Sequence, residues 1–138
     1  AISAEIGRDL ACSLDLTGRT DLATLHAIMS LAPIVIANNS GPAHLGAAAG
    51  TPVVCLYALT NPQHAPWGVP ARLLFADQPC RFCYRSVCPE GHHRCLADVH
   101  PDRVVEAVVG TARPAQDAVG GTTPPNPAKP VMLERRYL

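Results

Sequence analysis

Four cysteines fall close together in this 138-residue chain, in the pattern Cys80-x2-Cys83-x4-Cys88-x6-Cys95. A CxxC turn directs two sulfurs at one point, and tetrahedral zinc or iron takes four such ligands. The short loops between these cysteines keep all four thiols within reach of one ion. We therefore predict a closed structural site for zinc or iron, which leaves no coordination position open for a substrate.

Other states of these thiols stay open at this point, namely two disulfides or four free thiols. His92 and His93 are alternative ligands if one cysteine is displaced. The first residues show no basic segment followed by an apolar stretch, so we expect no secretory signal and a reducing compartment, which disfavours disulfides. Residues 78–98 hold few apolar side chains, so we expect this segment to need a metal as a staple.

A second candidate site is the turn cluster at residues 38–44. Ser40 and Gly41 are small enough to let a phosphate approach the backbone, and the Ser40 hydroxyl can add a donor. Pro42 suits the first turn of a helix, where free amides and a partial positive charge favour anions. His44 follows one turn after Ser40. The cluster fits a diphosphate site, and an ordinary tight turn between a strand and a helix explains the same residues.

Two short apolar runs frame this turn. Residues 34–37 and 53–57 lack polar alternation, which is typical of strands buried on both faces of a parallel sheet. Residues 42–49 predict a short helix closed by Gly50. Residues 34–57 therefore predict a strand–helix–strand unit with a right-handed crossover. Open sheets of this kind bind ligands at the carboxyl ends of their strands.

Further elements flank this unit. Apolar residues at spacings of three and four predict a helix over 21–31, capped by Thr20 or Asp21. Residues 72–75 are a candidate third strand. Pro101 opens a last helix whose apolar face would consist of valines, namely Val104, Val105, Val108 and Val109.

Composition bounds the class of protein. With 48% hydrophobic and 16% charged residues the chain can bury a core, and we expect one domain over residues 1–112. Eleven basic and eleven acidic residues cancel, which argues against a broad electrostatic nucleic-acid binder. No apolar run reaches the roughly 18–20 residues of a membrane span. The Pro- and Gly-rich residues 113–138 predict a flexible tail.

Several segments in order resemble glycosyltransferase family 9, the ADP-heptose:lipopolysaccharide heptosyltransferases. They are LTGRT (16–20), ANNSGPAHL (37–45), GTPVV (50–54) and TNP (60–62). Residues 80–95 are similar to a cysteine segment in many members of that family. The resemblance implies an α/β fold with a Rossmann-like parallel sheet, as part of the C-terminal, nucleotide-sugar-binding domain of a GT-B glycosyltransferase.

The resemblance also implies site residues by position. The residues that would face the ADP diphosphate and the sugar are Asn39, Ser40, Gly41, Pro42 and His44, and Thr60 and Asn61 would lie at the edge of the site. Asn39 stands where the family pattern usually has Asp. An amide supplies no negative charge, so only a hydrogen-bonding role carries over. The N-terminal domain, which supplies the catalytic carboxylate in the family, has no counterpart here, and we expect no catalytic residue in this chain.

We therefore expect the donor-binding portion of a heptosyltransferase, inactive alone, which uses an ADP-heptose-like donor and a lipopolysaccharide or other glycan acceptor. No catalytic cofactor is implied. Its partner would be the missing N-terminal domain or another chain against an exposed sheet edge. We expect a cytoplasmic location, compatible with peripheral attachment to the inner membrane. The alternative is a small cysteine-rich metal-binding interaction module without catalytic activity.

Overall fold

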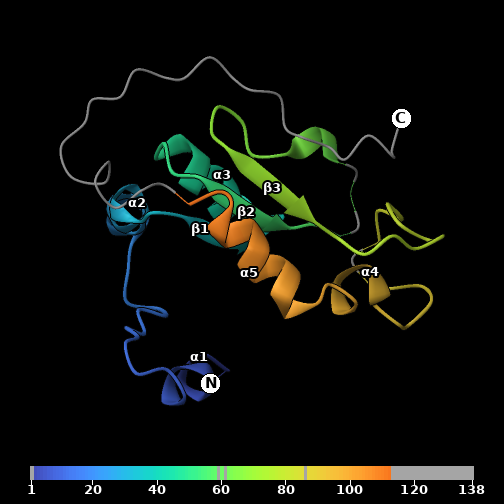
Figure 1. Ribbon diagram of the computed structural model, residues 1–138, viewed down its shortest axis with the longest axis horizontal. Helices are drawn as coiled ribbons and strands as arrows, with labels where there is room; N and C mark the ends of the chain where they lie inside the picture. Colours follow the sequence, from blue (N-terminus) through green and yellow to red (C-terminus); the bar gives the residue numbers. More distant parts are fainter. Residues whose placement is uncertain (1, 59, 61, 86, 113–138) are drawn as a thin grey trace.

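The computed structural model describes residues 2–58, 60, 62–85 and 87–112 (Figure 1). Its centre is a three-stranded parallel sheet in the order β1-β2-β3, formed by β1 (Val35–Asn38), β2 (Val53–Leu56) and β3 (Ala71–Leu74). Helix α3 (Gly41–Ala48) connects β1 to β2. The predicted strand–helix–strand unit and the candidate third strand are therefore confirmed.

The hydrophobic core lies on the side of the sheet that α3 covers. Its buried members are Val35, Ala43, Val53, Cys55 and Tyr57. Gly46 of α3 is also buried, and a Cβ at this position would lie 3.1–3.2 Å from side-chain atoms of Val35. The small residues of α3 thus allow the helix to approach β1 closely.

Helix α2 (Leu22–Leu31) packs against α3. The Asp21 carboxylate accepts a hydrogen bond of 2.7 Å from the Thr24 amide and caps the helix, so Asp21 rather than Thr20 is the cap. The Thr24 hydroxyl, followed by this amide hydrogen bond, lowers the pKa of Asp21. Helix α2 contributes Met29 to the core, while Leu22 remains 71% exposed.

Helix α5 (Pro101–Val109) lies on the opposite side of the sheet from α3, as Figure 1 shows, and contacts β2 and β3. The prediction that residues 34–37 are buried on both faces is wrong for Ile36, which is 53% exposed. The physical reason is that α5 packs chiefly over the two other strands. On this face Val54 of β2 is fully buried, whereas Ile36 of β1 is left uncovered.

The predicted apolar face of the last helix is only half correct. Val104 and Val108 are partly buried against the sheet, but Val105 and Val109 are exposed. The four valines span a wider arc than a three-stranded sheet can cover, because residues one apart on a helix point about 100° away from each other. Half of the valine face therefore remains exposed.

The remaining elements are short. Helix α1 (Ile2–Arg8) lies apart from the sheet in Figure 1, and η1 (Pro62–His64) and α4 (Arg94–Ala97) sit in the loops after β2 and β3. Within the described part of the chain, no helix has the length and apolar character that crossing a membrane would require. The predicted tail at 113–138 lies outside the described residues, and the extent of a single domain over 1–112 stays a prediction.

Candidate functional site

The turn between β1 and α3 lies at the carboxyl edge of the sheet. Strand β1 ends at Asn38, and the Asn39 amide still donates to the Leu56 carbonyl at 3.0 Å, so the turn starts from a fixed strand end. Ser40 is the N-cap residue of α3, and its carbonyl accepts a hydrogen bond of 3.0 Å from the Ala43 amide. This edge is where open α/β sheets bind their ligands.

The first turn of α3 is exposed and has no side-chain cap. The Ser40 hydroxyl donates to the Asn38 carbonyl at 3.4 Å instead of accepting from a helix amide. Gly41, Pro42 and His44 are all exposed, and a Cβ at Gly41 would meet no atom within 4 Å. Pro42 has no amide hydrogen, and the Ala43 amide already donates to the Ser40 carbonyl. The partial positive charge of the helix end is therefore what this turn offers to an anionic group.

Asn39 and Thr60 join two loops at this edge. The Asn39 Nδ2 donates a hydrogen bond of 2.6 Å to the Thr60 Oγ1, and both side chains are partly buried. The register of the sheet explains the contact: Asn38 pairs with Leu56, so the segments that follow β1 and β2 leave the sheet side by side. Two predicted site residues are thus in direct contact, whereas Asn61 lies outside the described residues.

Tyr57 is a polar residue at the end of the second apolar run, where the sequence pattern indicates only a strand. It is fully buried, and its hydroxyl has no hydrogen-bond partner within the described residues. Burial raises the pKa of Tyr57, and the nearby Thr60 hydroxyl opposes this rise more weakly. The phenol therefore stays protonated at neutral pH. The sequence signal that could have identified Tyr57 as a site residue is its position at the end of the second apolar run, shortly before Thr60.

Residues 78–98, the cysteine segment, are attached to the end of β3. The Ala76 amide donates to the Cys95 carbonyl at 2.9 Å, so the far end of the segment returns to the strand. The Gln78 side chain donates to the Asp98 carboxylate at 3.2 Å and connects the two ends of the segment. The cysteine segment is therefore a closed loop beside the sheet.

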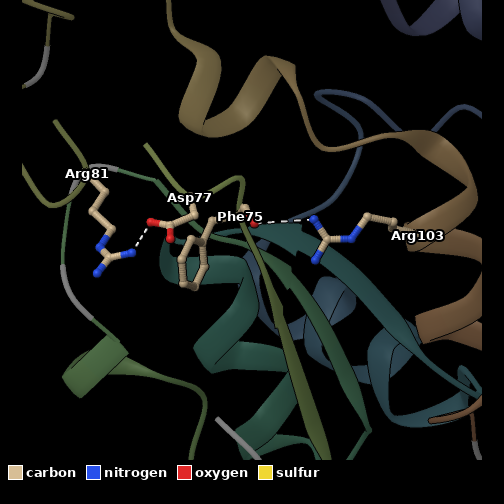
Figure 2. Close-up of polar contacts among 4 residues, drawn as sticks. All are labelled: Phe75, Asp77, Arg81 and Arg103. Atoms are coloured by element: carbon tan, nitrogen blue, oxygen red, sulfur yellow. Dashed lines mark hydrogen bonds and ion pairs between the residues drawn. The ribbon is translucent and has the colours of Figure 1, made fainter. Parts of the chain in front are cut away.

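Aromatic and charged contacts fix the first cysteine turn, as Figure 2 shows in part. The rings of Phe75 and Phe82 meet edge to face with centroids 5.7 Å apart. Arg81 lies over the Phe82 ring, 5.5 Å from its centroid, and forms an ion pair with Asp77. On the other side Arg103 of α5 donates to the Phe75 carbonyl at 3.5 Å. Arg81 and Phe82, the two residues between Cys80 and Cys83, are thus held by contacts with the end of β3.

The four predicted metal ligands are free thiols that do not form one group. Within the described residues, no three His, Cys, Asp or Glu side chains lie close enough together to hold an ion. The Cys80 Sγ lies 3.7 Å from the His92 Nε2 instead. The His92 Nδ1 accepts the Arg94 amide at 3.0 Å, so in the neutral ring the Nε2 carries the proton and faces the sulfur. The convergence of the four sulfurs is not confirmed.

The surroundings of Cys88 favour a thiolate. The backbone amide of His93, followed by those of Glu90, His92 and Gly91, lowers the pKa of Cys88. The described non-glycine residues with left-handed backbone all lie in the cysteine segment, at Phe82, Tyr84 and His93. Such backbone is often found at functional sites.

The metal site itself stays a prediction.

A family comparison matches the part of the chain that carries this geometry. The sequence model described as "Glycosyltransferase family 9 (heptosyltransferase)" matches residues 1–94. The chain belongs to glycosyltransferase family 9. The matched residues of this family 9 chain include the sheet, the turn before α3, and three of the four clustered cysteines.

Curated relatives and a solved structure agree with family 9. The chain is 33% identical over 94 residues to lipooligosaccharide heptosyltransferase 2 of Campylobacter jejuni, covering 67% of this chain and 30% of that relative. It is 29% identical over 93 residues to lipopolysaccharide heptosyltransferase 2 of Escherichia coli, covering 67% and 27%. A crystal structure of a family 9 glycosyl transferase from Veillonella parvula matches with a TM-score of 0.56 and 31% identity, covering 67% and 27%.

This family 9 chain spans less than a third of the length of these relatives. The likeness to the Veillonella parvula structure and the parallel sheet with helices on both sides confirm the predicted α/β fold. This confirmation applies only to the part of a family 9 protein to which this chain corresponds.

Proposed function

We propose that this chain is the donor-binding portion of a heptosyltransferase, which moves heptose from an ADP-activated donor to a lipopolysaccharide core. The family match and the names of its relatives support this proposal. The observation that carries it is the exposed first turn of α3 at the carboxyl edge of the sheet, next to the Asn39–Thr60 contact.

The departing group in such a transfer is a nucleoside diphosphate, which gains negative charge as the glycosidic bond to the sugar breaks. The Gly41 amide and the helix dipole at this end of α3 would stabilise that charge without reorganisation during the reaction. The Ser40 hydroxyl and the His44 side chain are exposed on the same turn and would contact the phosphates or the sugar. Thr60 and Asn61 would lie at the edge of the donor.

In our proposal, the base that activates the acceptor does not come from this chain. A base from another part of the intact protein would deprotonate the acceptor hydroxyl, which would then attack the anomeric carbon of the donor sugar. The chemistry needs no catalytic cofactor in this proposal. We place the reaction in the cytoplasm, with the acceptor glycan at the inner membrane.

The outer edge of β1 is the proposed contact with the rest of the intact protein. Strand β1 is an edge strand of the sheet, and its residue Ile36 is 53% exposed. Helix α2 precedes β1 and packs with α3. A right-handed connection through a helix on that side requires the preceding parallel strand to lie beyond β1, away from β2. The free edge would therefore pair with a further strand, which would also cover Ile36.

Isothermal titration of the chain with adenosine, AMP and ADP tests the proposal. We expect affinity to rise with each added phosphate, because the contact is made to the diphosphate. Equal affinity for the three compounds would contradict a phosphate site at the turn. Metal analysis of the same sample addresses the alternative function. Bound metal without any nucleotide binding would favour the cysteine-rich interaction module.

A further inference from the structure

We propose that Tyr57 is a positioning residue of the donor site, whose buried hydroxyl holds Thr60 in place beside the first turn of α3. The inference rests on the proposed function, because it concerns the same site. It assigns Tyr57 no contact with the donor. The hydroxyl acts through Thr60, which lies at the edge of the site.

The backbone of Tyr57 is a fixed point at the carboxyl edge of the sheet. Its amide donates a hydrogen bond of 2.7 Å to the Leu74 carbonyl, and the carbonyl of the preceding Leu56 accepts one of 3.0 Å from the Asn39 amide. Tyr57 therefore extends the contact between β2 and β3 by one residue. Its side chain is fully buried and belongs to the hydrophobic core. Backbone and ring together anchor the residue.

Two groups that follow β2 direct hydrogens toward the Tyr57 oxygen. Burial has the largest influence on the pKa of Tyr57 and raises it, whereas the Thr60 hydroxyl and the His64 backbone amide both lower it. A hydrogen-bonding group that lowers the pKa of a phenol donates toward its oxygen. Within the described residues, neither contact has the geometry of an ordinary hydrogen bond. The Tyr57 oxygen therefore lies close to both Thr60 and His64 without being tightly bound by either.

Thr60 connects this buried oxygen with the donor site. The Thr60 Oγ1 accepts a hydrogen bond of 2.6 Å from the Asn39 Nδ2, and the hydroxyl hydrogen of Thr60 faces Tyr57. Asn39 directly precedes Ser40, the N-cap residue of α3. One line of polar contacts thus runs from the core to the exposed first turn of α3, and Tyr57 is its buried end.

The packing of the core does not require the Tyr57 hydroxyl. A phenylalanine would fill the same space in the core cluster without burying a polar atom that lacks an ordinary hydrogen bond. What the hydroxyl adds is an acceptor beneath Thr60 and His64, where a phenyl ring offers none. The hydroxyl therefore serves the position of these two residues rather than the stability of the core.

Replacing Tyr57 with phenylalanine separates positioning from packing. Y57F removes the hydroxyl alone, so its melting temperature should equal or exceed that of the wild type, because no ordinary hydrogen bond is lost. We expect Y57F to weaken ADP binding on the order of fivefold, which is the equivalent of one hydrogen bond. The matched control is V54A. Val54 of β2 is fully buried and faces the other side of the sheet, so V54A should lower the melting temperature and leave ADP affinity unchanged.

Titrations with adenosine show where the hydroxyl acts. Y57F should bind adenosine like the wild type, because Thr60 lies beside the turn that receives the phosphates. Equal ADP affinity of Y57F and the wild type would overturn the inference while leaving the proposed function intact. Equal losses of adenosine and ADP affinity in Y57F, or an equal loss of ADP affinity in V54A, would overturn it as well. A wild-type chain that binds no ADP would contradict the proposed function and the inference with it.

Hydrogen exchange provides a readout that needs no nucleotide. The Thr60 amide donates to the Ala58 carbonyl at 2.6 Å, and the Asn39 amide, bonded to the end of β2, serves as the reference. We expect Y57F to speed exchange at Thr60 and His64 several-fold and to leave Asn39 at its wild-type rate. Equal acceleration at all three amides would indicate general loosening of the fold and would overturn the positioning role.

Discussion

The hydroxyl of Thr51 donates a hydrogen bond of 2.7 Å to the backbone carbonyl of Met29. Thr51 is fully buried just before β2, and Met29 lies in the last turn of α2. The bond therefore joins the helix that precedes β1 to the strand that follows α3. The Met29 carbonyl, near the end of α2, also accepts a hydrogen bond of 3.1 Å from the Ala32 amide.

Replacing Thr51 with valine should destabilise the fold. T51V keeps the shape of the side chain but removes one of the two hydrogen bonds to the Met29 carbonyl, which still accepts from the Ala32 amide, so we expect a loss of about 0.5–1.5 kcal/mol. Chemical denaturation monitored by far-UV circular dichroism measures the change. T51S keeps the hydroxyl and should lose less stability than T51V. If T51V and T51S were equally destabilised, the hydrogen bond would not be the cause.

Gly46 should tolerate no larger residue. A Cβ there would approach the Val35 side chain to 3.1–3.2 Å, so we expect G46A to cost about 1–3 kcal/mol through overpacking. V35A in the G46A background should recover part of that loss, because it removes the two Val35 methyl groups and leaves only the Cβ in close contact. A thermal melt of the four proteins in this cycle measures the coupling. Additive losses in the double variant would contradict the close contact.

Gly41 should behave in the opposite way. A Cβ at Gly41 would meet no atom within 4 Å, so G41V should leave the melting temperature nearly unchanged. We expect the branched side chain to block the approach of a diphosphate to the helix end and to weaken ADP binding at least tenfold. Calorimetric titration with ADP and a thermal melt test both parts. Unchanged ADP affinity in a folded G41V chain would remove Gly41 from the site.

The cysteine segment gives a prediction about metal content. If Cys80, Cys83, Cys88 and Cys95 hold one ion, the freshly isolated chain should contain about one zinc or iron per chain. A chelator should then release four titratable thiols and loosen the cysteine segment first, while the strand–helix–strand unit stays folded. Elemental analysis and a thiol titration measure this. A metal-free chain, or one with two disulfides on isolation, would refute the site.

The thiols of the metal-free chain should differ in reactivity. Backbone amides lower the pKa of Cys88, whereas burial raises the pKa of Cys55 to about 11. A lowered pKa means that the thiolate of Cys88 forms at lower pH, so alkylation of Cys88 should accelerate at lower pH than alkylation of Cys55. Cys55 should remain unmodified until the chain unfolds. Mass spectrometry after timed alkylation at several pH values resolves the order, and early modification of Cys55 would contradict it.

Much of the fold follows from local patterns along the chain. The unbroken apolar run before Asn38, the small residues after Pro42 and the second apolar run ending at Tyr57 predict strand, helix and strand in the right places. Hydrophobic periodicity and capping chemistry act over a few residues, so they can be recognised without the tertiary structure. The motifs around Asn39 also carried the resemblance to the family that the comparisons confirmed.

Other features depend on contacts between residues far apart in sequence. Ile36 belongs to an apolar run, and only the position of α5 over the neighbouring strands leaves it exposed. Asn39 and Thr60 are 21 residues apart, and the sheet register brings them together. The spacing of the cysteines predicts that their sulfurs converge, whereas the Cys80 sulfur lies 3.7 Å from the His92 Nε2. The sequence alone determined the elements and the family, whereas the tertiary structure decided which side chains meet, because burial and register arise only when the elements pack.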